Sequence, residues 1–177
     1  MIASPTGTVS FPHLAKPEAM NEGQPKKYSV VLIFDADEPL TEMRKMADAC
    51  AAEKWPKGIA NLRSPFRKNE EKDGIEGYPP GGIFVTFSTR EEKGRPKIAA
   101  ADKSLIEDLS EVYPGCRGRV ACSCYAYDKG GNRGIAFGLS GLQKMGEGKR
   151  LGGDGGNPLS VFGIEEGEAE GTVEMFG

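Results

Sequence analysis

The sequence predicts a mainly β fold, a small five-stranded barrel with one longer and one short helix and a disordered acidic tail. Apolar residues alternate with a period of two in several short runs, as expected for strands. Glycine is frequent, with 25 residues, and 12 prolines accompany it, which favours strands, turns and bulges over long helices. The clearest pair of strands is joined by a turn that contains two adjacent glycines.

Two strands and the longer helix are expected in the first third of the chain. Residues 8–14 predict a short strand, which Pro12 restricts to an edge or a first position. Residues 27–34 are apolar on both faces, as in a central strand. Asp37 favours a helix start, and apolar residues at spacings of three and four predict an amphipathic helix over residues 39–54.

A long loop, a third strand and a short helix are expected next. Residues 58–80 are polar with few apolar side chains, which predicts a partly flexible loop. Residues 82–89 alternate strongly and predict a strand. Asp102 can cap a short helix that ends before Pro114.

Residues 119–128 and 133–142 predict a hairpin with two different faces. One face is apolar and consists of Val120, Cys122, Cys124, Ala126, Ile135, Phe137 and Leu139. The other face combines basic and aromatic side chains with very small ones: Arg119, Tyr125, Tyr127, Gly134, Ala136 and Gly138. Five strands with a helix between the second and third fit a strongly curved, glycine-rich barrel, and an OB-fold fits best among such barrels.

The charge is unevenly distributed along the chain. The net charge is −3, from 23 basic and 26 acidic residues. Six acids and no base follow Arg150, so residues 1–150 carry 23 bases, 20 acids and a net charge of +3. We therefore expect a mildly basic folded domain over residues 1–150, a glycine-rich linker with last contacts over 151–164, and an acidic disordered tail over 165–177.

Several functional classes lack their signatures. The chain has one histidine, His13, and neither a G-x-S-x-G elbow nor a P-loop, so we expect neither an enzyme nor a cofactor. The spacing of Cys116, Cys122 and Cys124 favours core packing over a zinc site. No apolar run approaches the ~20 residues of a membrane span, and no signal peptide is recognisable, so a cytoplasmic protein is expected.

Basic and aromatic side chains predict a site for single-stranded nucleic acid. Aromatic rings stack on bases without sequence preference, and cations follow the phosphates. Tyr125 and Tyr127 share a strand face, Phe84 lies on the mixed face of another strand, and small neighbours would let a nucleotide approach the sheet. The expected phosphate contacts are Arg119, Lys129, Arg133, Arg63, Arg67, Lys68, Arg90, Lys93, Arg95 and Lys97.

The acidic tail predicts a regulatory role. An acidic segment on a basic body can fold back and compete with a polyanion, although a merely solubilising tail is the alternative. The tail residues expected to contact partners are Glu165, Glu166, Glu168, Glu170, Glu174 and Phe176. A purely solvating tail gains nothing from an aromatic such as Phe176.

Five segments, in order and spacing, resemble a known family. They are SFPHL at 10–14, KYSVVLIF at 27–34, YPG at 113–115, RVACSCYAYD at 119–128, and GNRGIAFGL at 131–139 with Gln143 following. The chain is similar over about residues 8–165 to the tailed-phage single-stranded-DNA-binding proteins, formerly a family of unknown function. The resemblance implies an OB-fold, sequence-tolerant binding of single-stranded DNA, and a role in phage DNA replication and recombination in the host cytoplasm.

The resemblance also concerns the tail and the partners. Related phage proteins end in an acidic tail closed by an aromatic residue that contacts phage or host replication proteins. Phe176 matches that aromatic, although Gly177 follows it. An exposed barrel edge would allow a homodimer. The alternatives are a small metal-dependent nuclease, which would need clustered carboxylates, and a virion structural protein with a glycine-rich arm.

Overall fold

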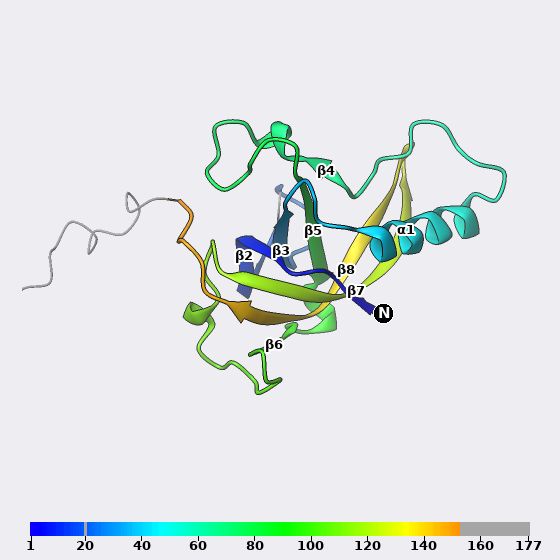
Figure 1. Ribbon diagram of the computed structural model, residues 1–177. Coiled ribbons are helices and arrows are strands. Elements are labelled where there is room, and N and C mark those ends of the chain that lie inside the picture. Colours follow the sequence, from blue (N-terminus) through cyan, green and yellow to red (C-terminus); the bar gives the residue numbers. More distant parts are fainter. Residues whose placement is uncertain (20, 153–177) are drawn as a thin grey trace, which may run out of the picture.

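The computed structural model describes residues 1–19 and 21–152, and within them the fold is mainly β with a single α-helix (Figure 1). The elements in chain order are β1 (Ile2–Ala3), β2 (Gly7–Glu18), β3 (Lys27–Phe34), α1 (Thr41–Lys54), β4 (Arg67–Lys68), β5 (Ile83–Arg90), β6 (Lys97–Ala99), β7 (Arg117–Lys129) and β8 (Asn132–Gly146). Short 3₁₀ turns lie at Asn69–Lys72 (η1), Glu91–Lys93 (η2) and Leu109–Glu111 (η3).

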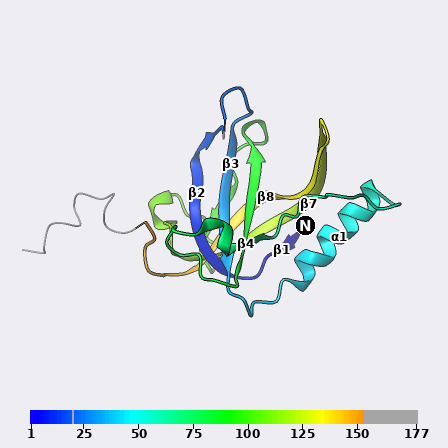
Figure 2. The same cartoon turned by 90° about the horizontal axis from the view of Figure 1, so that it is seen from above.

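The five long strands pair in a closed circuit. β2 pairs with β3, β3 with β5, β5 with β8, β8 with β7, and β7 pairs back with β2. Within this circuit the β5–β8 pairing is parallel and the other four are antiparallel. Figure 2 shows β2, β3 and β5 side by side. The strand ring therefore has an inner face that forms the core and an outer face that is available to ligands.

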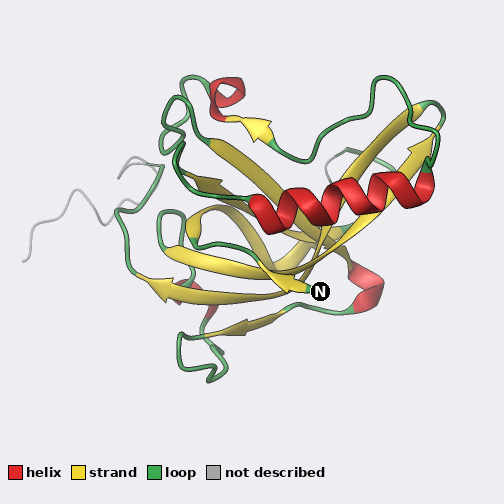
Figure 3. Cartoon of the chain, turned by 45° about the vertical axis from the view of Figure 1, so that its right-hand side comes forward, coloured by secondary structure: helices red, strands yellow, loops and turns green. Residues whose placement is uncertain are grey.

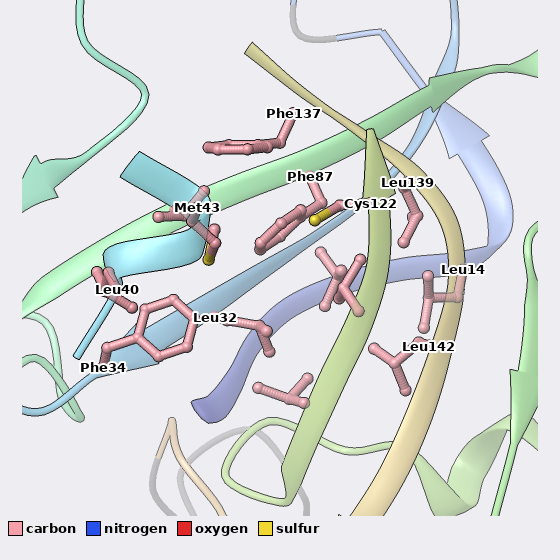
Figure 4. Close-up of a cluster of buried hydrophobic side chains, with 14 of the residues drawn as sticks. Leu14, Leu32, Phe34, Leu40, Met43, Phe87, Cys122, Phe137, Leu139 and Leu142 are labelled. Atoms are coloured by element: carbon pink, nitrogen blue, oxygen red, sulfur yellow. The ribbon is translucent and has the colours of Figure 1, made fainter. Parts of the chain in front are cut away.

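The inner face is packed with the apolar side chains that alternate along each strand (Figure 4). Leu32 and Phe34 of β3 lie beside Phe87 of β5 and Phe137 of β8, and all four are essentially inaccessible to water. The hairpin face predicted to be apolar points into this core. It follows that the other side chains of β7 and β8 face outward.

Helix α1 closes one side of the core and contacts β7 and β8, as Figure 3 shows. Met43 and Ala47, one turn apart, are its buried residues. The helix starts at Thr41, later than predicted, and Leu40 rather than Asp37 occupies the N-cap position without a side-chain cap. Leu40 is only 5% exposed, so its burial, rather than a polar cap, holds this end of the helix.

The prediction of a short helix after Asp102 is wrong. The Asp102 carboxylate accepts hydrogen bonds from the backbone N–H and the hydroxyl of Ser104, at 2.9 and 2.5 Å. Asp108 makes the same contacts with Ser110, at 3.0 and 2.6 Å. Such side-chain turns compete with helical hydrogen bonding, and only the single 3₁₀ turn η3 forms there.

The polar segment over residues 58–80 is attached to the sheet in two places. Its residues 67 and 68 form β4, which pairs with the first two residues of β5. Upstream, the Arg63 N–H donates to the Arg133 carbonyl at 2.9 Å, and the Ile135 N–H donates to the Arg63 carbonyl at 3.2 Å. The segment thus fills the gap where β5 and β8 diverge, a feature that the sequence did not predict.

The last described residues are bound to the segment Tyr113-Pro-Gly115. The Leu151 N–H donates to the Pro114 carbonyl at 2.8 Å, and the Arg150 guanidinium lies 4.8 Å from the Tyr113 ring centroid. Gly115 has φ +108°, and a Cβ there would collide with the Lys149 carbonyl, so glycine is required. Leu151 then packs on the outer face of β3 and β5. Among the residues described, no helix is long and apolar enough to span a membrane.

Candidate nucleic-acid interface

A row of small side chains, with His13 at its β2 end, crosses the outer face of the strand ring. His13 of β2 pairs with Ser29 of β3, Ser29 with Ser88 of β5, Ser88 with Gly138 of β8, and Gly138 with Ser123 of β7. At about 4.8 Å between neighbouring strands, the row spans about 19 Å. A Cβ on Gly138 would lie 3.1 Å from the Ser123 hydroxyl, so even one added methyl group would crowd the row. Its short side chains leave the backbone of the row open to close approach by a nucleotide.

Cations lie along one side of this small-residue row. Lys27 pairs with Arg90 across β3 and β5, one outward position beyond the Ser29–Ser88 pair. Burial lowers the pKa of Lys27, and the nearby charges of Lys129 and Arg90 lower it further. These cations repel one another in the free protein. A polyanion would relieve the repulsion, which favours phosphate binding here.

The two tyrosines predicted as stacking residues lie at the β7 end of the row. Tyr125 pairs with Ala136 and is 41% exposed. Tyr127 pairs with Gly134, and its ring covers that glycine, since a Cβ there would lie 2.8 Å from the tyrosine Cε1. Tyr125 therefore offers an open ring face, and Tyr127 is a half-buried ring supported by the backbone of β8.

Phe84 occupies a different environment from the one expected of a stacking residue. It is 5% exposed, and the Tyr78 ring packs against it edge-on with centroids 5.4 Å apart. Val31 and Ile33 complete this apolar cluster, with Leu151 at its margin. A base could reach Phe84 only if Tyr78 moved, so Phe84 supports the outer face rather than lining it.

Several predicted cations gather around the tyrosine end of the face. Arg63 pairs with Gly134, beside the Tyr127 ring. The pKa of Arg67 is raised, chiefly by its hydrogen bond to Glu71, and the nearby Tyr127 side chain also raises it. Arg133 lies 3.2 Å from the Asp128 carboxylate. Arg67 and Arg133 are thus paired with carboxylates at the edge of the tyrosine pair, and Arg63 lies beside them.

The remaining predicted cations are placed elsewhere. Arg119 donates its Nε–H to the Gln143 side chain at 2.7 Å, and Gln143 donates in turn to the Ala101 carbonyl at 2.8 Å. That chain of bonds joins β7 to the segment after β6. The other predicted cations are exposed and lie outside the row: Lys68 on β4, Lys93 in η2, Arg95 after it and Lys97 on β6.

The site residues predicted from the sequence do not include Lys27, Ser29, Ser88 or Ser123. The signal was present in the alternation of β3 and β5, where Ser29 and Ser88 interrupt otherwise apolar or β-branched outward positions. The tail residues expected to contact partners, Glu165–Phe176, lie outside the described residues.

The cysteines are core residues. Cys116 and Cys122 are fully buried, and burial raises the pKa of the Cys122 thiol to about 11. Burial, followed by the neighbouring Cys50 thiol, raises the pKa of Cys124 to about 12. The fold thus brings Cys50 of α1 next to Cys124, although the two residues are 74 positions apart in the sequence. No group of three or more His, Cys, Asp or Glu side chains suited to a metal ion occurs within residues 1–19 and 21–152.

Comparison with protein families gives a match over nearly the whole chain. Residues 5–173 match the family model described as the Enterobacter phage Enc34 ssDNA-binding protein. Among curated protein sequences, none matches the chain significantly.

Comparison with solved structures also finds phage single-stranded-DNA-binding proteins. The single-stranded DNA-binding protein from bacteriophage Enc34 in complex with ssDNA superimposes with a TM-score of 0.70 at 17% identity, covering 85% of this chain and 88% of that one. The single-stranded DNA-binding protein gp2.5 of bacteriophage T7 superimposes with a TM-score of 0.65 at 16% identity, covering 96% and 98%. At these identities the likeness shows a shared fold.

Proposed function

Because the chain belongs to the family of the Enterobacter phage Enc34 single-stranded-DNA-binding protein, we propose that it binds single-stranded DNA without sequence preference. The site is the outer face of the strand ring, which we interpret as an OB-fold barrel. The small-residue row carries the proposal, because the tyrosine pair lies at its β7 end and the cations Lys27 and Arg90 lie along its side. Bases would stack on the tyrosines while phosphates contact the cations.

The direct test is a titration of the full chain with an oligo-dT and with a duplex of equal length at low salt. The rings can stack only on bases that are not already stacked in a helix, and each such stack contributes about 1–3 kcal/mol. We therefore expect about 30-fold or greater preference for the single strand. Equal affinity for both forms would contradict the proposal.

We also propose that the protein acts without catalysis, in phage DNA replication and recombination in the host cytoplasm. The family match and the fold shared with T7 gp2.5 support this role. No cofactor is needed, because stacking and charge neutralisation account for the binding. Phage or host replication proteins are the proposed partners of the tail, with Phe176 as its aromatic contact.

The acidic tail is proposed to compete with DNA for the outer face. Two facts support this proposal. Residues 1–150 carry a net charge of +3, whereas six acidic residues and no basic residue follow them in the sequence. Leu151 lies on the outer face of β3 and β5, so the chain leaves the described domain beside the proposed site. The last described residues thus lie on the face that carries the proposed site.

Deleting residues 165–177 is expected to tighten DNA binding severalfold at low salt, because an internal competitor is removed. The measurement is a fluorescence titration of oligo-dT with the full and the shortened chain. A full-length variant with its five tail glutamates changed to glutamine is the matched control and should bind as tightly as the shortened chain. Unchanged or weaker binding after deletion would mean that the tail is passive.

A further inference from the structure

Phe11 is an exposed aromatic held in an unfavourable backbone conformation. It lies within β2, where the pairing with β3 shifts between Ser10 and His13, which marks a bulge. Its φ is +43°, in the left-handed region that a bulky residue rarely occupies. Its side chain is nevertheless 45% exposed, so the strain does not serve to bury the ring.

The Phe11 ring lies on the same outer face as the proposed DNA site. The Lys72 ammonium is 5.9 Å from the centroid of the Phe11 ring and 5.6 Å from that of Phe84, whose side chain points outward from β5. Just before the bulge, the Ser10 hydroxyl is hydrogen-bonded to the Tyr78 hydroxyl at 2.9 Å in a buried contact. This contact fixes the strand from which Phe11 projects.

Phe11 therefore stands at the opposite end of the small-residue row from Tyr125. His13, two positions away, is the β2 member of that row, and Ser123 is its β7 member. One end thus has an exposed tyrosine and the other an exposed phenylalanine with a lysine beside its ring. The bulge directs the Phe11 ring to the outer face, where regular alternation along β2 would not place it.

We propose that Phe11 and Lys72 form a second base-binding subsite, in which a nucleobase stacks on the Phe11 ring and Lys72 contacts the adjoining phosphate. In the free protein, the exposure of the Phe11 ring and the strain of its backbone are both unfavourable. A base stacked on the ring would bury it. The DNA strand then crosses the sheet from Tyr125 to Phe11 along the row. This subsite rests on the proposed binding of single-stranded DNA to the same face.

The test uses Phe11→Gly in the full chain, because glycine adopts the positive φ without strain. Affinity for oligo-dT is expected to fall about 5-fold to 150-fold, the equivalent of one lost stack. The thermal midpoint is expected to stay the same or to rise. Phe11→Trp keeps a ring and should retain the affinity. The control is Leu105→Ala, which removes a 68% exposed apolar side chain beside β6 and should change neither quantity.

The outcomes separate the subsite from the function as a whole. If the unmodified chain binds oligo-dT and Phe11→Gly binds equally well, the subsite is wrong and the proposed function stands. If the unmodified chain does not bind, the proposed function fails. Should Phe11→Gly fail to fold, Lys72→Gln decides the matter without altering the bulge. It should reduce the slope of log affinity against log salt by about 0.7, and an unchanged slope would overturn the proposal.

Discussion

Replacing both Tyr125 and Tyr127 with alanine should weaken the binding of oligo-dT by about 30-fold or more. Each stacked base contributes about 1–3 kcal/mol, and a factor of ten corresponds to about 1.4 kcal/mol. Tyr125 should account for the larger share, because its ring is the more exposed of the two. Equilibrium titration of the single and double variants measures each contribution.

The matched control keeps both rings and removes only the hydroxyls. Tyr125→Phe with Tyr127→Phe should bind nearly as tightly as the unmodified chain, since stacking uses the ring faces. Because Tyr127 covers Gly134, its alanine variant should also lose some stability, which thermal unfolding would report. A large fall in melting temperature with unchanged affinity for the double alanine variant would assign both rings to packing.

Raising the salt concentration from 50 to 200 mM should lower the affinity for oligo-dT by about 50-fold. The estimate takes about four neutralised phosphates, one each for Lys27, Arg90, Lys129 and Lys72. Each phosphate contributes about −0.7 to the slope of log affinity against log salt for a single strand. Titrations at four salt concentrations give this slope.

Single charge changes should show where the phosphates bind. Lys27→Gln is expected to reduce the steepness of the slope by about 0.7, whereas Lys54→Gln, at the exposed end of α1, should leave it unchanged. Binding that is independent of salt would exclude a phosphate-directed mechanism. Equal effects of the two substitutions would mean that only the overall charge matters.

Local patterns predicted which side chains of the hairpin lie on the face of the proposed site. The alternation along β7 and β8 assigned Tyr125 and Gly138 to the outer face, and a short turn fixes the register between the two strands. The row through Ser29 and Ser88 depends on pairings between strands that are 59 positions apart. No local pattern specifies such a register, so alternation could mark Ser29 and Ser88 as unusual outward residues but could not place them side by side.

For two predicted site residues, a distant segment determines the surroundings of the side chain. Phe84 alternates as an outward residue, yet Tyr78 from the preceding loop covers it. Arg119 alternates correctly, yet Gln143 on the neighbouring strand holds its guanidinium. The short helix failed for a local reason, because Asp102 and Asp108 bond to serines two residues ahead of them. A helix prediction based only on the spacing of apolar residues takes no account of that competition.

The closed circuit of strands has a consequence for synthesis on the ribosome. Gly7 of β2 pairs with Gly118 of β7, 111 residues later. At about 5–20 residues per second, β2 waits roughly 5–20 s before its second neighbour has been translated. During that time one edge of β2 is open to other chains, and non-local strand pairing is slow even once the sequence is complete. Productive folding of this protein is thus expected to begin only when its final hairpin has left the ribosome.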